Sequence, residues 1–236
     1  MNTPVLNQAA IEASVSRLAP QLVVPLVVIA ISFVALLYFQ RHFATRVISL
    51  LRYRILWFPV LAPAVIAHET AHALMCVLTL TRLTSFVPFW PHYNSFDNSW
   101  TLGHVDHREV GGIRTALISF GPLLLVPPAL SAAIYLLMGT LDPGHLWAAA
   151  ASVGPARTAV AVALIALIGN AAAPSSGDDF RPWAVAALVV LLVAAAAATV
   201  YLAGEAVLVS AVGVVALLFT LPALIVGVVY VVARKV

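Results

Sequence analysis

Long apolar runs separated by short polar segments dominate the chain. A helix needs about 20 apolar residues to cross a hydrocarbon core of about 30 Å, and several runs approach or exceed that length. Only Gly204 and Glu205 separate the last two runs, as in a tight turn. The pattern predicts about six membrane-spanning helices, at residues 21–39, 55–80, 115–138, 158–173, 183–203 and 206–231.

Three segments between these runs are more polar. Residues 41–54 intersperse arginines with apolar side chains, which is typical of an interfacial helix or a basic connector. Residues 81–113 form the longest polar stretch, and the strand-like segment 101–107 in it predicts a short membrane-associated hairpin or a re-entrant loop. Residues 139–157 are expected to form a connector that contains a short interfacial helix.

The composition agrees with the prediction of membrane-spanning helices and excludes other classes of protein. The chain is 63% hydrophobic and 9% charged, whereas an average soluble domain is about 25% charged. A soluble enzyme, a disordered chain and a secreted disulfide scaffold are therefore excluded, and Cys76 has no second cysteine to pair with. We expect an all-α polytopic membrane protein with a single membrane domain, 1–236, divided into an N-terminal span with its basic connector (1–54), a central core (55–180) and a C-terminal helical hairpin (181–236).

The charges indicate a bilayer as partner and leave the orientation open. The net charge is +3, and the basic residues are scattered between apolar runs, where they contact lipid headgroups rather than form a nucleic-acid surface. With the N-terminus inside, seven basic residues lie on the cytoplasmic side, and with the opposite topology five do. These two numbers are too similar for the positive-inside rule to determine the orientation. The bias toward Arg, Ala and Val is typical of a GC-rich genome, which indicates a multi-pass protein of a bacterial cell membrane. Nothing in the sequence indicates an oligomeric state.

The second apolar run contains the motif His68-Glu69-Thr70-Ala71-His72. Histidines at i and i+4 lie on the same face of a helix, so both imidazoles can reach one zinc ion. The glutamate after the first histidine is suited to act as a base for a water molecule. A buried polar cluster that contacts a neighbouring helix without metal is the simpler alternative. Ionisable groups inside an apolar run are costly unless they are paired or bind a metal, so we expect one zinc ion per chain.

A hydrolytic zinc site needs a third protein ligand and an open position for water. Asp178 and Asp179 directly follow the fourth run, in a Pro-Ser-Ser-Gly turn before the apolar fifth run. A carboxylate at this position can reach into a helical bundle. An exposed N-cap of the next helix is the other explanation for the pair, and the two roles are compatible. From these residues alone, either aspartate could be the third ligand.

Two motifs together resemble the site-2 protease family of intramembrane zinc metalloproteases. The first is the HETAH segment on an early span, and the second runs from Asn170 through Pro174 and Ser175 to Asp178. In that family an asparagine precedes, by eight residues, the aspartate that completes the metal site, and Asn170 and Asp178 have this spacing. The chain departs from the usual second motif, because it has one proline there, at 174, and Asp179 where a glycine is usual.

The resemblance implies a fold and an activity. It implies a three-helix catalytic core from the second to the fourth span, with zinc held by His68, His72 and Asp178. It further implies that Glu69 is the general base and that Asn170 donates a hydrogen bond to the substrate or to the oxyanion. The polar stretch 81–113 would then resemble the hairpin that presents a substrate as an added strand. The partner would be a membrane-protein substrate cleaved in or near its transmembrane segment.

Two other classes of function remain open at this point. One is a non-proteolytic membrane protein, either a zinc transporter or an inactive protease-like binding protein; the scarcity of polar residues on the other spans disfavours a transporter. The other is a different HExxH membrane protease that uses the distal Glu205 as its third ligand. His104 and His107 could form a second metal pair or contact substrate, although histidines in loops are more often solvated.

Overall fold

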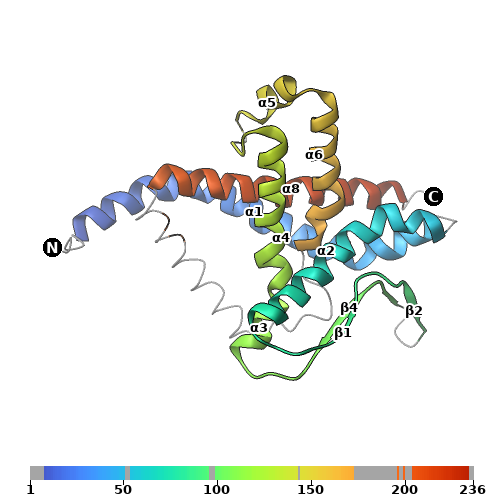
Figure 1. Ribbon diagram of the computed structural model, residues 1–236. Helices are drawn as coiled ribbons and strands as arrows, with labels where there is room; N and C mark the ends of the chain where they lie inside the picture. Colours follow the sequence, from blue (N-terminus) through green and yellow to red (C-terminus); the bar gives the residue numbers. More distant parts are fainter. Residues whose placement is uncertain are drawn as a thin grey trace.

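A computed structural model describes residues 8–50, 54–95, 99–142, 144–172, 196, 199 and 204–233. Most of these residues are helical, and the short strands all fall between the second and third helices (Figure 1). The elements follow in this order: α1 (Gln8–Leu50), η1 (Arg54–Leu56), α2 (Trp57–Leu78), β1 (Leu83–Val87), β2 (His92–Asn94), β3 (Ser99–Thr101), β4 (His104–His107), α3 (Ile113–Ser119), α4 (Gly121–Met138), α5 (Leu146–Val153), α6 (Pro155–Ile168), η2 (Gly169–Ala172) and α8 (Glu205–Ala233).

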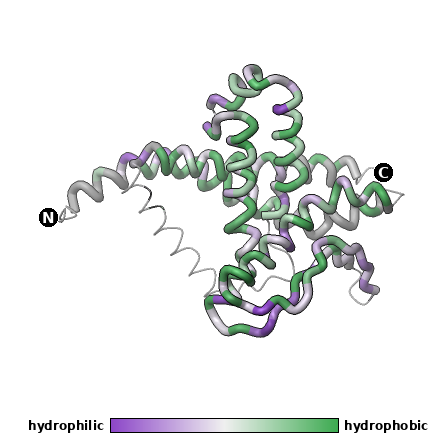
Figure 2. Tube along the Cα trace, in the orientation of Figure 1, coloured by the Kyte–Doolittle hydropathy of each residue, from purple (hydrophilic) through white to green (hydrophobic). Residues whose placement is uncertain are grey.

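Among the described residues, five helical segments are long and apolar enough to cross a membrane. They agree in length and composition with five of the predicted spans, and the fold is compatible with an integral membrane protein. Figure 2 shows apolar residues along these helices and polar ones mainly in the connecting segments. The predicted span at 183–203 falls almost entirely outside the described residues. The five segments are Ser16–Leu36, Trp57–Leu78, Gly121–Met138, Pro155–Ala172 and Val207–Leu224.

Two of the predicted spans are interrupted. The run at 115–138 forms two helices, α3 and α4, which meet at Phe120, because Pro122 has no N–H to continue the ladder of hydrogen bonds. The run at 158–173 ends in the tighter 3₁₀ turn η2. Both interruptions lie beside α2, so they change the backbone next to the HETAH segment.

Helices α2, α4 and α6 pack against one another, and α1 packs along α8. In Figure 1 the α4–α6 hairpin crosses the α1–α8 pair, with α2 below the crossing. One buried cluster joins α1, α2, α4, η2 and α8, and it includes Leu36, Ala71, Ala171 and Phe219. A second cluster fills the space between α4, α6 and α8. The HETAH segment therefore lies where the central helices meet the α1–α8 pair.

The four strands form the hairpin that the polar stretch predicted. Strand β1 pairs antiparallel with β4, and β2 pairs antiparallel with β3. The Trp90 N–H donates to the Leu102 carbonyl between the two ladders, at 2.6 Å. Pro88 and Pro91 have no N–H to donate, which explains why the pairing divides into two short ladders. The hairpin is thus long and interrupted at its middle.

The connector between α4 and α6 contains the expected short helix, α5, which has no buried residues. Before it, the ring of His145 donates a hydrogen bond of 2.6 Å to Asp142, and the Gly144 N–H donates another of 2.9 Å. The bond from His145, followed by that from Gly144, holds the pKa of the Asp142 carboxyl below its usual value. This end of the hairpin therefore carries a charged turn next to an exposed helix.

Candidate metal centre

Helix α2 places the two histidines of the motif on one buried face. His68 and His72 are 6% and 8% exposed, although they sit in the middle of an apolar helix. Their ring centroids are 4.7 Å apart, with the ring planes at 79°. The i, i+4 spacing therefore produces the adjacent pair of imidazoles that the sequence predicted.

Each histidine is fixed by a backbone carbonyl from another element. Nδ1 of His68 donates to the carbonyl of Ala171 in η2, at 2.8 Å, and Nδ1 of His72 donates to that of Ile118 in α3, at 2.7 Å. Because a carbonyl oxygen can only accept, both Nδ1 atoms carry the proton. In the neutral rings the lone pairs are then on Nε2, and the two Nε2 atoms lie 3.1 Å apart.

This donor set fits a zinc ion. Two nitrogen lone pairs at 3.1 Å repel each other unless a cation or a proton lies between them. Two imidazoles bound to one tetrahedral zinc at Zn–N distances of about 2.0–2.1 Å have their nitrogens about 3.3 Å apart. Histidines that bind metals also donate their other ring N–H to a carbonyl or carboxylate, as both rings do here. His68 and His72 would thus supply two of the three protein ligands.

Glu69 lies at the edge of this pair, next to the β hairpin. A Cβ atom at Gly103 would lie 2.9 Å from the Glu69 Cγ and 2.9 Å from the carbonyl oxygens of Val87 and Pro88. Only a glycine fits so close a passage without displacing a neighbour. The short link between β3 and β4 therefore passes close to the side chain expected to act as the base.

Asn170 also lies at this place in the fold, in η2, one residue before the carbonyl that holds His68. Its Oδ1 is buried and, within the described part of the chain, has no hydrogen-bond partner. A buried amide oxygen left without a partner is costly, and a ligand bound beside it would offset that cost. Asp178 and Asp179, the candidates for the third ligand, lie outside the described residues.

Glu205, the alternative third ligand, and the single cysteine do not lie in one group with the histidine pair among the described residues. Glu205 begins α8 and forms an ion pair of 3.3 Å with Arg17. Cys76 is fully buried and packs with Met75 and Ile118. Within the described ranges, no group of three His, Cys, Asp or Glu side chains is close enough to hold a metal ion. This arrangement disfavours Glu205 as the third ligand.

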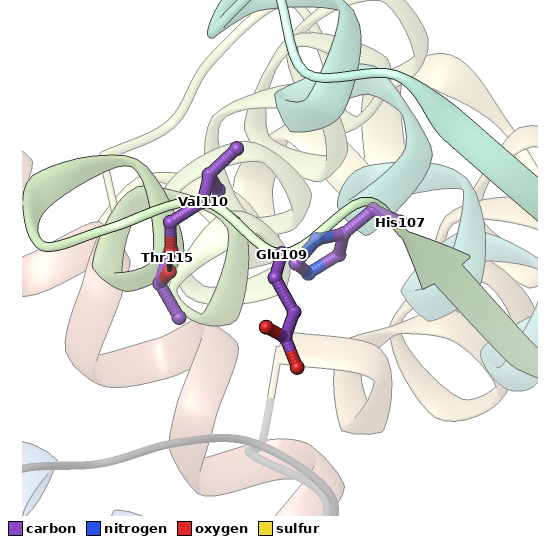
Figure 3. A pocket seen from close by; sticks show the side chains of 4 residues that line it. All are labelled: His107, Glu109, Val110 and Thr115. Atoms are coloured by element: carbon purple, nitrogen blue, oxygen red, sulfur yellow. Dashed lines mark hydrogen bonds between the residues drawn. The ribbon is translucent and has the colours of Figure 1, made fainter.

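His104 and His107 lie on β4, away from the α2 pair. Nε2 of His104 is 3.8 Å from the Asp106 carboxylate and 3.4 Å from the Ser85 hydroxyl. His107 donates from Nδ1 to the carbonyl of Arg108, at 3.0 Å. Figure 3 shows His107 beside Glu109 at a shallow pocket of 340 Å³, whose lining residues are His107, Glu109, Val110 and Thr115. Neither histidine joins the predicted metal centre.

Sequence reasoning predicted the pairing of His68 with His72 but missed three backbone features around it. These are the carbonyls of Ile118 and Ala171 and the close passage at Gly103. One signal in the sequence points to the first of them, because Pro122 stands four residues after Ile118 and leaves its carbonyl without the usual helical donor.

Comparisons of the chain with protein-family models, with curated proteins and with solved structures gave no match. The geometry of the site therefore carries the functional argument.

Proposed function

We propose that the protein is an intramembrane zinc metalloprotease of the site-2 protease type, which hydrolyses peptide bonds in or near the transmembrane segments of membrane proteins. The observation that supports this most directly is the pair of Nε2 atoms 3.1 Å apart, each on a ring fixed through Nδ1. The base expected of a metalloprotease, Glu69, directly follows the first of these histidines. A bacterial cell membrane is the proposed location.

Under this proposal His68, His72 and Asp178 hold one zinc ion. A zinc ion held by these residues would lower the pKa of a water molecule toward 7 and polarise the scissile carbonyl. Glu69 accepts the proton of the attacking water and delivers it to the leaving amine. Asn170, whose Oδ1 is buried and which precedes the residue that bonds His68, hydrogen-bonds the substrate.

The hairpin over Glu69 suits the delivery of an extended substrate. A helical substrate satisfies its own backbone in the membrane, so it has to unwind locally before its peptide bond can be attacked. Among the described residues β1 pairs with β4 alone, so no strand pairs with its other edge. A substrate strand added there would satisfy its backbone groups near Gly103, which passes close to Glu69.

The decisive variant is Glu69→Gln, which keeps the size of the side chain and removes the base. We expect full zinc content and a fall in cleavage of about 10²- to 10⁴-fold, the usual contribution of a general base. Zinc is measured by elemental analysis of the purified protein. Cleavage is measured in proteoliposomes with single-span substrates whose transmembrane segment contains Gly or Pro.

Three further variants serve as controls. His68→Ala is expected to lose both zinc and cleavage, whereas Glu205→Gln, which changes a glutamate paired with Arg17, keeps both. Asp178→Ala is expected to lose zinc. Undiminished proteolysis by Glu69→Gln would refute the proposal, and zinc flux across vesicles without any cleavage would indicate a transporter instead.

A further inference from the structure

The break between α3 and α4 lies directly beside the candidate metal centre. In a continuous α-helix the N–H of residue 122 would donate to the carbonyl of residue 118. Residue 122 is a proline, almost completely buried, and proline has no N–H to donate. The carbonyl of Ile118 therefore lacks the helical donor that it would otherwise have.

That same carbonyl is the one that fixes His72. It accepts the Nδ1 proton of His72 at 2.7 Å, and it also accepts a backbone N–H at the C-cap of α3. A carbonyl oxygen has two lone pairs, so these two bonds use its full capacity. An N–H at position 122 would be a third donor to the same oxygen and would compete with the imidazole.

We propose that Pro122 is a positioning residue for the metal centre. By withholding an N–H, it leaves one lone pair of the Ile118 carbonyl to His72. The bond to this carbonyl keeps the proton of His72 on Nδ1, and the lone pair on Nε2 then faces Nε2 of His68. The inference rests on the proposed function only in taking zinc as the ion that these nitrogens bind.

The first test compares two proline substitutions in the same helix. Pro122→Ala restores an N–H next to the histidine, whereas Pro128→Ala makes the same change at an exposed position of α4. We expect Pro122→Ala to weaken zinc binding about 10- to 100-fold, the usual effect of losing a partner of a metal-binding histidine, and to change the absorption spectrum of bound Co²⁺. Pro128→Ala is expected to match the wild type in both. Zinc affinity is measured by competition with a chelator on the full chain in detergent.

The second test separates the missing N–H from the packing of the proline ring. Position 122 is replaced by lactic acid, which has the side chain of alanine but forms an ester without an N–H. We expect this ester variant to bind zinc as tightly as the wild type. If it binds as weakly as Pro122→Ala, the ring and not the absent N–H positions the site, and the inference is wrong. If Pro122→Ala does not fold, the ester variant alone decides.

The outcomes for this inference and for the proposed function are distinct. A wild-type protein that holds no zinc overturns both. A wild-type protein whose zinc depends on His68, together with unchanged zinc affinity in Pro122→Ala, overturns only the role of Pro122. Because the readouts are metal affinity and the Co²⁺ spectrum, neither depends on finding a substrate.

Discussion

Single residues set the geometry around Glu69. The flexible carboxylate side chain lies close to the backbone at Gly103, where a Cβ atom would come within 2.9 Å of the Glu69 Cγ and of two carbonyl oxygens. The histidines beside it are held by carbonyls of other elements, at 2.7 and 2.8 Å. Gly103 therefore constrains the proposed base, whereas the two carbonyls hold the histidines.

This separation leads to a prediction for Gly103→Ala. The added methyl group has to push the hairpin backbone or the Glu69 side chain aside. Misplacement of a catalytic group by a fraction of an ångström to 1 Å can lower a rate by up to about 100-fold. We expect cleavage to fall about 10- to 100-fold while zinc content stays at the wild-type value. Gly111→Ala is the matched control, since a Cβ atom there meets no atom within 4 Å. If Gly103→Ala cleaves at the wild-type rate, the backbone at Gly103 does not constrain Glu69.

The sequence was sufficient to pair His68 with His72, because their spacing alone puts both rings on one helix face. It was not sufficient for the carbonyls of Ile118 and Ala171, which come from elements distant in the sequence. Such contacts depend on how helices pack. The same limit applies to Gly103, whose role appears only when the hairpin is placed on α2.

At the scale of elements, η2 is held between α2 and α8. Its carbonyl at Ala171 bonds His68 on one side, and on the other side Gly169 packs directly against the ring of Pro222 in α8. Pro222 is almost completely buried. Hydropathy predicted both helical runs but not the contact between Gly169 and Pro222. A long apolar run does not indicate which neighbouring helix each of its residues will contact. The position of η2, and of Asn170 in it, thus depends on α8.

The contact predicts a coupled pair of substitutions. In Gly169→Ala the new Cβ atom would overlap the Pro222 ring, and overpacking of this kind typically costs about 1–3 kcal/mol. We expect a lower thermal midpoint for Gly169→Ala, and a double variant with Pro222→Ala that is less destabilised than the sum of the two single changes. Thermal unfolding of the four proteins in detergent measures the coupling. Strictly additive effects would mean that the two residues are not in contact.

At the scale of the whole molecule, α1 and α8 run parallel and side by side. Arg17 pairs with Glu205 near the start of α8, and Ser32 bonds Thr220 further along, at 3.3 and 3.1 Å. Both pairs are separated by 188 residues, so the two helices advance together in the same direction. Figure 1 shows the same parallel course, from the end marked N toward the end marked C. Hydropathy could not predict this, since it finds spans without their direction or partners.

The parallel pair predicts the sides of the membrane on which the two chain ends lie. A bilayer crossed by α1 and α8 in the same direction has the N-terminus on one face and the C-terminus on the other, whereas six alternating spans would place both ends on one face. We therefore expect opposite signals from reporters fused to the two ends, with alkaline phosphatase active outside the cytoplasm and a fluorescent protein bright inside it. Arg17→Glu with Glu205→Arg reverses the ion pair and serves as the control that keeps the same topology. Both ends on one face would contradict the parallel arrangement, because two adjacent spans that start on opposite faces can only be antiparallel.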